Sequence, residues 1–377
     1  SKETTLESTL QVAGKTDFLS DASMNANLLV AGVATLNSNL NVSKETTLGS
    51  TLQVAGKTDF LSDASMNANL LVAGDATLNS NLNVSKETIL GSTLQVSGKT
   101  EFLSDASMNA NLLVDGDATL NSNLNVSKET TLSSTLQVTG KSEFLSDASM
   151  NASLLVDGVA TLNSNLNVSK ETTLSSTLQV AGKTEFLSDA SMNSNLLVDG
   201  NVSLNSNLNV SKDTILGSTL QVSGKTEFLS DASMNANLLV AGDATLNSSL
   251  NVSKDTTLNS TLQVAGKTDF LSDVSMNSNL LVAGDVSLNS NLNVSKDTIL
   301  GSTLQVAGKT DFLSDVSMNT NLLVAGDATL NSNLNVSKET TLSSTLQVAG
   351  KTEFLSDASM NANLLVDGDA TLNSNLN

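Results

Sequence analysis

A strict 42-residue repeat is the sequence feature that most limits how this chain can fold. The segment from Ser1 to Val42 recurs with small changes, and the nine copies start at residues 1, 43, 85, 127, 169, 211, 253, 295 and 337. The ninth copy stops one residue before a full repeat, at Asn377. A fixed period of this size predicts a repeat architecture, in which each unit packs mainly on its neighbours. We therefore expect one continuous array over residues 1–377, as a segment of a longer chain.

A shorter period of six residues lies inside each copy. Of the twelve large apolar residues of the first copy, seven occupy the sixth position of a hexad: Leu6, Val12, Phe18, Met24, Val30, Leu36 and Val42. Leu10, Leu28 and Leu40 occupy the fourth position, and only Leu19 and Leu29 are out of register. With a period of seven the same residues scatter over six phases, which argues against a coiled coil.

Each hexad predicts a short strand followed by a turn. Residues at positions four and six are two apart, so their side chains point to the same side of an extended strand. Gly, Asn, Ser and Ala gather at positions one and two, and these residues tolerate tight corners. Three hexads can close one turn, so the sequence predicts an all-β fold, an elongated three-sided β-helix (β-solenoid).

Two arrangements of chains fit this pattern. A single-chain solenoid would form each turn from three consecutive hexads and would be about 100 Å long at ~4.8 Å per turn. An intertwined homotrimer would take one strand per layer from each of three chains and would be about 300 Å long. Seven hexads per copy are not a multiple of three, so a single chain would mix unlike side-chain pairs within a turn. We favour the homotrimer, because its symmetry places three equivalent hexads in every layer.

The composition opposes most enzyme and nucleic-acid-binding functions. The chain contains no His, Cys, Trp, Tyr, Pro or Arg, and its net charge is −20. An ordinary zinc site, an imidazole base and a thiol nucleophile therefore cannot form. The negative charge repels nucleic acid and anionic membranes, and no apolar run has the length of a membrane span. We expect a protein that is not an enzyme, with no catalytic residue, no metal site, no cofactor and no membrane insertion.

Two acidic segments are candidate Ca²⁺ sites. Asp115–Asp117 and Asp367–Asp369 both read Asp-Gly-Asp, and carboxylates are hard ligands that Ca²⁺ accepts. Other copies carry Ala73–Asp75 or Ala31–Val33 at the same place, and the nonapeptide of calcium-binding β-rolls is missing. We interpret both segments as solvated turns.

Three other polar features have simple surface interpretations. Asn41–Ser43 reads Asn-Val-Ser, a glycosylation sequon for a eukaryotic secretory host that recurs at each of the eight junctions between copies. The interpretation we prefer is that this Asn is an outward polar residue. Asn37 and Asn39 are candidates for side-chain ladders along the stack. Lys2–Glu3 and Lys15–Asp17 place surface charge that keeps a long tube soluble.

Parts of the repeat share their spacing of Leu, Val and Gly with known proteins. Leu70–Val84 (LLVAGDATLNSNLNV) and Ser50–Thr58 (STLQVAGKT) resemble the L-x-V-x-G-x-x-x-L-x-G-x-L-x-V arrays of fibre and shaft proteins from tailed phages and large algal viruses. The resemblance covers the whole chain, but Ser38 and its equivalents stand where Gly is frequent. It implies a structural shaft, often trimeric, on a virion surface or outside the cell, with a receptor-binding tip outside this segment.

The predicted function is mechanical. We expect a rigid fibre shaft that holds a distance and presents an attachment tip. The alternative is a self-assembling extracellular or cell-surface filament. It stays open because solenoids normally end in polar caps, whereas the first copy differs from the others only in details such as Glu7 and Val33. End-to-end stacking of copies would then cover the open strand edges.

Overall fold

The computed structural model describes residues 3–377, which form short strands joined by turns, with no helix among them. Lys2 of the predicted Lys2–Glu3 surface pair lies outside the described residues. Contacts divide the chain into two units, residues 1–188 and 189–377. The prediction of one uninterrupted array over residues 1–377 remains a prediction.

The strands follow the hexads without exception in the described part of the chain. Each strand has three residues, and strand βn runs from residue 6n − 2 to residue 6n. The first unit contains β1 (Thr4–Leu6), β2 (Leu10–Val12), β3 (Thr16–Phe18) and so on to β31 (Thr184–Phe186). The second unit begins at β32 (Ala190–Met192), β33 (Leu196–Val198) and β34 (Val202–Leu204) and continues to β62 (Ala370–Leu372). The predicted strand at positions four to six of each hexad is confirmed.

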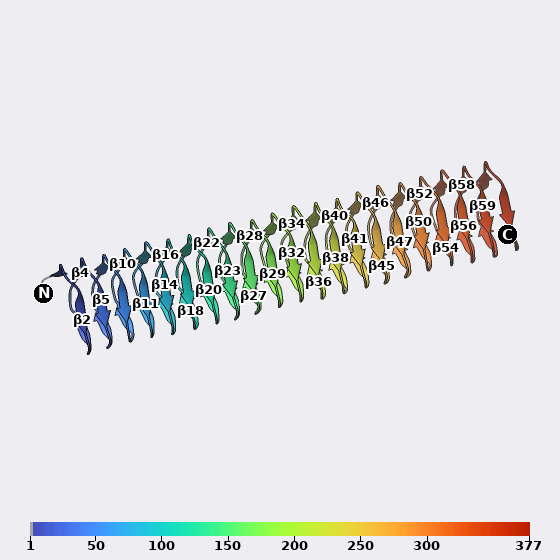
Figure 1. The fold of residues 1–377 in the computed structure, drawn as a ribbon. Coiled ribbons are helices and arrows are strands. Elements are labelled where there is room, and N and C mark those ends of the chain that lie inside the picture. Colours follow the sequence, from blue (N-terminus) through green and yellow to red (C-terminus); the bar gives the residue numbers. More distant parts are fainter. Residues whose placement is uncertain (1–2) are drawn as a thin grey trace. The chain divides into compact units, whose positions relative to one another are not determined.

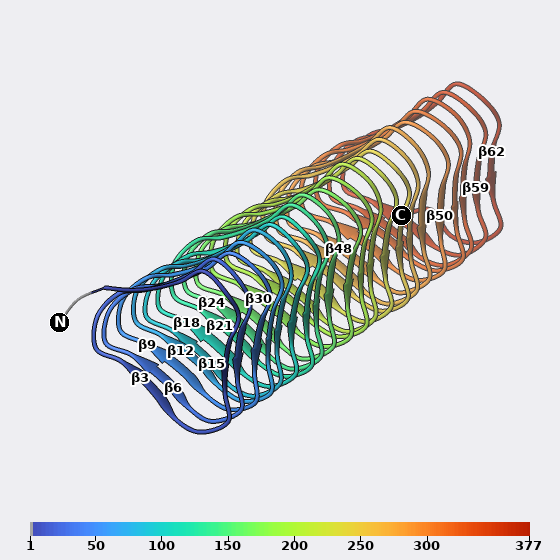
Figure 2. The ribbon, with the colours of Figure 1, turned by 60° about the vertical axis from the view of Figure 1, so that its left-hand side comes forward.

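Each unit is a three-sided solenoid of parallel strands. A strand pairs in parallel with the strand that starts 18 residues later, as β10 (Thr58–Phe60) does with β13 (Ala76–Leu78). Three consecutive strands therefore make one turn, and every third strand belongs to the same sheet. We name the sheets A, B and C after their first strands β1, β2 and β3. Figure 1 shows the successive turns of the first unit, coloured blue to green, from the side. Figure 2 shows the same turns obliquely, so that the outline of each coil is visible.

In this structure each turn is formed by three consecutive strands of one chain, as in the single-chain alternative, and the homotrimer stays a prediction. In the trimer, the neighbours of β10 would come from other chains, whereas β10 pairs with β7 (Leu40–Val42) and β13 of its own chain. In the single-chain arrangement, unlike side chains stack on successive turns, and this mixing evens out the side-chain volume along the core. Phe60 lies between Val42 and Leu78, so no Phe stacks directly on another. A symmetric trimer would instead bring three Phe side chains together at one height.

The inward residues of the hexads form the core of each unit. Phe60 and Met66 are 1% and 0% exposed, and the other residues at positions four and six are buried in the same way away from the outermost turns. The two residues that were out of register in the first copy point outwards. Leu19 is 70% exposed on a corner, and Leu29 lies at the centre of β5 (Leu28–Val30), between two buried residues. The position of a residue within its hexad therefore predicts correctly whether its side chain points into the core or away from it.

Position four of the first and third hexads places hydroxyl groups in the core. Thr58 and Ser142 are 0% and 1% exposed. Their hydroxyl oxygens belong to a set of 17 buried Thr and Ser hydroxyls with no hydrogen-bond partner among the described residues. Burying a hydroxyl without a partner costs free energy. This core is therefore less stable than its shape allows.

We expect Thr58→Val to raise the free energy of unfolding by about 1 kcal/mol, because Val keeps the shape and removes the unpaired hydroxyl. Urea unfolding followed by circular dichroism measures the change. The matched control is Thr77→Val, at the outward centre of β13. A Thr58→Val variant less stable than the starting chain would show that the hydroxyl is satisfied.

The corners bring the backbones of successive turns close together. A Cβ atom on Gly74 would lie 2.6 Å from the carbonyl oxygen of Gly56, one turn earlier. Gly116 meets the carbonyl oxygen of Gly98 at 2.4 Å in the same way. No described residue, glycine included, has a positive φ angle. Glycine is needed at these corners for close approach, and not for an unusual backbone conformation.

Candidate functional site

The main polar feature of each unit is a ladder of hydrogen bonds along its corners. Asp63 Oδ1 accepts hydrogen bonds from Ser80 Oγ and from the backbone N–H of Asn81 at 3.1 Å, both one turn later. Asn81 Oδ1 in turn accepts from the backbone N–H of Lys99 at 2.8 Å. The same Asp–Ser contact occurs in all nine copies, at Asp21, Asp63, Asp105, Asp147, Asp189, Asp231, Asp273, Asp315 and Asp357. The ladder therefore ties each such corner to the next turn.

In several copies a second aspartate, at the third position of the sixth hexad, makes the same contacts. Asp75 Oδ1 accepts from Ser92 Oγ and from the backbone N–H of Thr93 at 3.2 Å. Asn201 replaces this aspartate in the fifth copy and accepts from Ser218 Oγ and the Thr219 N–H. Asn39, one of the two asparagines predicted to form side-chain ladders, bonds to the backbone of the next turn, where its Oδ1 accepts from the N–H of Lys57 at 2.8 Å.

The ladder lowers the pKa of its aspartates. For Asp63, the hydrogen bond from Ser80 is the main cause and the backbone N–H of Asn81 the second, and together they outweigh partial desolvation. The pKa values of Asp105 and Asp147 are lowered for the same reasons. A carboxylate that is more acidic when folded stabilises the fold at neutral pH. That contribution is complete above the ordinary pKa of 3.8 and is lost as the pH falls through the lower folded value.

We expect the melting temperature to fall as the pH is lowered below about 4, where these carboxylates take up protons. Replacing all nine ladder aspartates by Asn should flatten this dependence, because an amide oxygen still accepts the hydrogen bonds, as Asn201 does, but does not titrate. Thermal melts followed by circular dichroism between pH 7 and pH 2 measure both curves. Equal pH slopes in the two proteins would contradict a stabilising role for the ladder.

The two Asp-Gly-Asp segments lie at corners and use their carboxylates differently. Asp117 accepts from Ser134 Oγ and from the backbone N–H of Thr135 at 3.2 Å. Asp115 lies 3.4 Å from Ser133 Oγ. In the last copy, Asp369 Oδ2 lies 3.8 Å from Lys351 Nζ. Among residues 3–377, no cluster of three or more Asp, Glu, His or Cys side chains could hold a metal ion.

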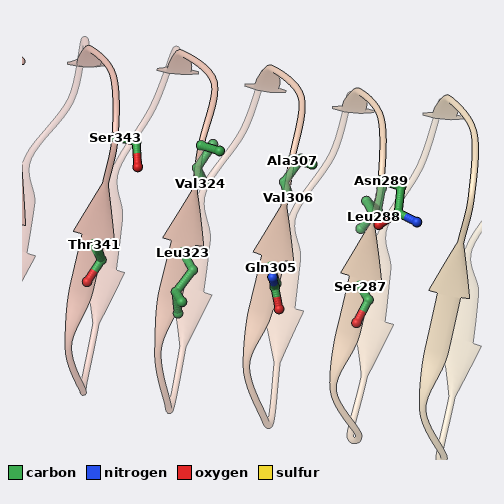
Figure 3. A pocket seen from close by; sticks show the side chains of 11 residues that line it. Ser287, Leu288, Asn289, Gln305, Val306, Ala307, Leu323, Val324, Thr341 and Ser343 are labelled. Atoms are coloured by element: carbon green, nitrogen blue, oxygen red, sulfur yellow. The ribbon is translucent and has the colours of Figure 1, made fainter. Parts of the chain in front are cut away.

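Shallow hollows with partly apolar walls recur on the outer faces of the sheets. In the first unit, Gln53, Leu71 and Ile89 follow one another on successive turns of sheet C and line a hollow of about 340 Å³. Ile89 is 45% exposed. Figure 3 shows an equivalent hollow of about 350 Å³ in the second unit, where Gln305 and Leu323 point outwards.

These hollows form where large outward residues stand beside corners built of small residues. Ala307 and Ser343 lie at the corners beside the hollow in Figure 3, and Ala325 lines it as well. The out-of-register leucine at the position of Leu29 is the sequence signal for them, since its equivalents are Leu71 and Leu323. Sequence reasoning noted this leucine but did not assign it to a surface hollow.

Comparisons with protein-family models, with curated proteins and with solved structures yield no match for this chain. Among the described residues, no helix has the length and apolar character needed to cross a membrane.

Proposed function

We propose that this chain is a structural spacer, the rigid shaft of a fibre. The observation that carries the proposal is the uniform strand pairing within each unit, in which each strand pairs in parallel with the strand 18 residues away, in the same register from turn to turn. In sheet B, for example, Leu28 pairs with Leu10 one turn earlier and with Thr46 one turn later. A protein built this way gains stability and length in proportion to the number of turns.

The outer surface supports a role in holding distance. Charged residues at the strand centres are limited to one acidic residue per copy, such as Asp59 or Glu101, and the other charges lie in the turns. The net charge of −20 opposes uncontrolled aggregation of the long polar surface.

The finer parts of the proposal rest on the sequence resemblance to phage and algal-virus shafts. They are a location outside the cell or on a virion, self-association of the shafts, with three copies as the first number to test, and an attachment tip outside this segment. In that case each shaft would be a solenoid formed by one chain, and several such solenoids would associate.

Removing residues 43–168 tests the spacer function. This segment contains three copies, or seven turns, so a single-chain shaft should shorten by about 34 Å at ~4.8 Å per turn. An intertwined trimer would lose 21 layers and shorten by about 100 Å. Electron microscopy gives the length, and light scattering gives the mass. Particles that are flexible, or whose length does not change with the deletion, would refute the spacer.

A self-assembling filament is the second candidate. The hollows with half-buried Leu71 and exposed Ile89 favour it, because apolar surface on a flat face can be covered by another molecule. A filament predicts a mass that grows with protein concentration. It also predicts that Leu71→Lys together with Ile89→Lys lowers this mass without changing the circular dichroism spectrum. A concentration-independent mass favours the spacer alone.

A further inference from the structure

We propose that the asparagines of the Asn-Val-Ser segments at the copy junctions are acceptor sites for N-linked glycans. The sites are Asn41, Asn83, Asn125, Asn167, Asn209, Asn251, Asn293 and Asn335. Asn-x-Ser is the acceptor sequence for this modification, and by itself it is a weak signal. The structure adds three observations that favour modification at these positions.

The first observation is the position of the asparagine on its strand. Asn41 is the exposed central residue of β7, between Leu40 and Val42, which are 1% and 0% exposed. All eight asparagines have this central place between two buried residues. A sugar on the side-chain nitrogen would therefore extend away from the core and leave the strand pairing intact.

The second observation is the set of neighbours on the sheet. Asn41 lies opposite Ser23 on the preceding turn and Asp59 on the following turn. The other seven asparagines have the same neighbours, a Ser before and an Asp or Glu after. The small Ser leaves space for the first sugar, and the carboxylate can accept hydrogen bonds from its hydroxyls.

The side-chain nitrogen is held weakly at these sites. Asn83 Nδ2 donates to Glu101 Oε2 at 3.3 Å, and Asn209 donates to Glu227 at 3.5 Å. Both distances are long for a hydrogen bond. Where the following residue is the shorter Asp, as it is beside Asn41, the asparagine is exposed.

The third observation is a polar hollow beside one of the sites. In the second unit, a hollow of about 470 Å³ contains Asn293 together with Ser275 and Asp311. Asn291 and Lys309 line it as well. Such a surface can hydrogen-bond to a sugar with both donors and acceptors.

The repeat distributes the sites over the three faces. In the first unit, Asn41 belongs to sheet A, Asn83 to sheet B and Asn125 to sheet C, because each copy contains two turns and one further strand. Asn167 returns to sheet A after seven turns, about 34 Å at ~4.8 Å per turn. Glycans at these positions would cover every face and limit side-by-side contact between copies.

In a eukaryotic secretory pathway the sugar donor is a lipid-linked oligosaccharide diphosphate, and a transferase catalyses the step. The Asn Nδ2 forms a bond to C1 of the first sugar while the bond from C1 to the diphosphate oxygen breaks. The lipid diphosphate leaves with the bonding electron pair, and the amide loses one proton to a base on the transferase.

The test is secretion of the full chain, behind a cleavable signal peptide, from eukaryotic cells. We expect glycopeptide mass spectrometry to find all eight sites occupied. We also expect the same β-sheet circular dichroism spectrum before and after enzymatic removal of the glycans. The control variant changes the Ser two residues after each junction site to Ala, as in Ser43→Ala, which keeps the asparagine and removes the acceptor sequence at that site.

Three results would overturn the proposal: a folded secreted chain without glycans, a glycosylated chain without β-structure, or secretion of the Ser→Ala variant alone. If neither protein is secreted, bacterially produced chain is treated with a soluble N-glycosyltransferase and its nucleotide sugar. Modification of Asn41 in the folded chain then supports the proposal, and its absence refutes it. Asn201, which begins another Asn-Val-Ser segment, is the internal comparison, because its Oδ1 already accepts from Ser218.

Discussion

Replacing all nine phenylalanines by aspartate is expected to abolish folding of the chain. A single change, Phe102→Asp, already removes a side chain that is 1% exposed and is stacked between Val84 and Leu120. Loss of a buried Phe costs about 3–5 kcal/mol, before the cost of burying an unpaired carboxylate is added. Each turn of a solenoid is stabilised mainly by its neighbours, so we expect the turns around residue 102 to open. Urea unfolding and limited proteolysis with mapping of the cleavage sites measure both effects.

The neighbouring residue provides a matched control for this prediction. Leu103 is 42% exposed at the corner that follows β17 (Thr100–Phe102). Leu103→Asp introduces the same carboxylate one residue away, and we expect a change within about 0.5 kcal/mol. Equal losses of stability in the two variants would mean that Phe102 is not inside the solenoid.

The second large effect is expected at the glycine corners. In Gly74→Val, the new Cβ would lie 2.6 Å from a carbonyl oxygen and 2.7 Å from the carbonyl carbon of Gly56. The clash is with backbone, so it can be relieved only by moving one turn relative to the other. We expect a loss of about 1–3 kcal/mol for Gly74→Ala and a larger loss for Gly74→Val. Urea unfolding at neutral pH provides the measurement.

Gly14 is the control, because no atom lies within 4 Å of the position of an added Cβ. Gly14→Ala should therefore change the free energy of unfolding by less than about 0.5 kcal/mol. If glycine were needed for its backbone flexibility, both substitutions would lower the free energy of unfolding by similar amounts. The close-approach explanation predicts a loss at Gly74 alone.

The sequence predicted the strands well because one period controls both local structure and burial. The inward residues of the hexads, such as Val30 and Leu36, follow from their place in the repeat, and the structure buries them away from the outermost turns. The number of chains per turn could not be obtained in this way. A strand has the same inward pair whether its neighbour is 18 residues away in the same chain or belongs to another chain.

The corner ladder was missed for a related reason. Asp63 and Ser80 are 17 residues apart, and this spacing has meaning only once the length of a turn is known. The surface hollows depend on the same information, because Gln53 and Leu71 become neighbours only after one full turn. Local periodicity therefore determines what is inside, whereas the turn length determines which outward residues meet.

The difference between the 42-residue copy and the 18-residue turn has a consequence for how such a gene can change. Unequal recombination that adds or removes one copy keeps every inward pair in register, because 42 is a multiple of six. The same event rotates everything that follows by one third of a turn, so a feature on sheet A is moved to another face. Only a change of three copies restores the original direction. A change in copy number can thus alter both the number of turns and the face on which every later feature lies, while the core remains equally well packed.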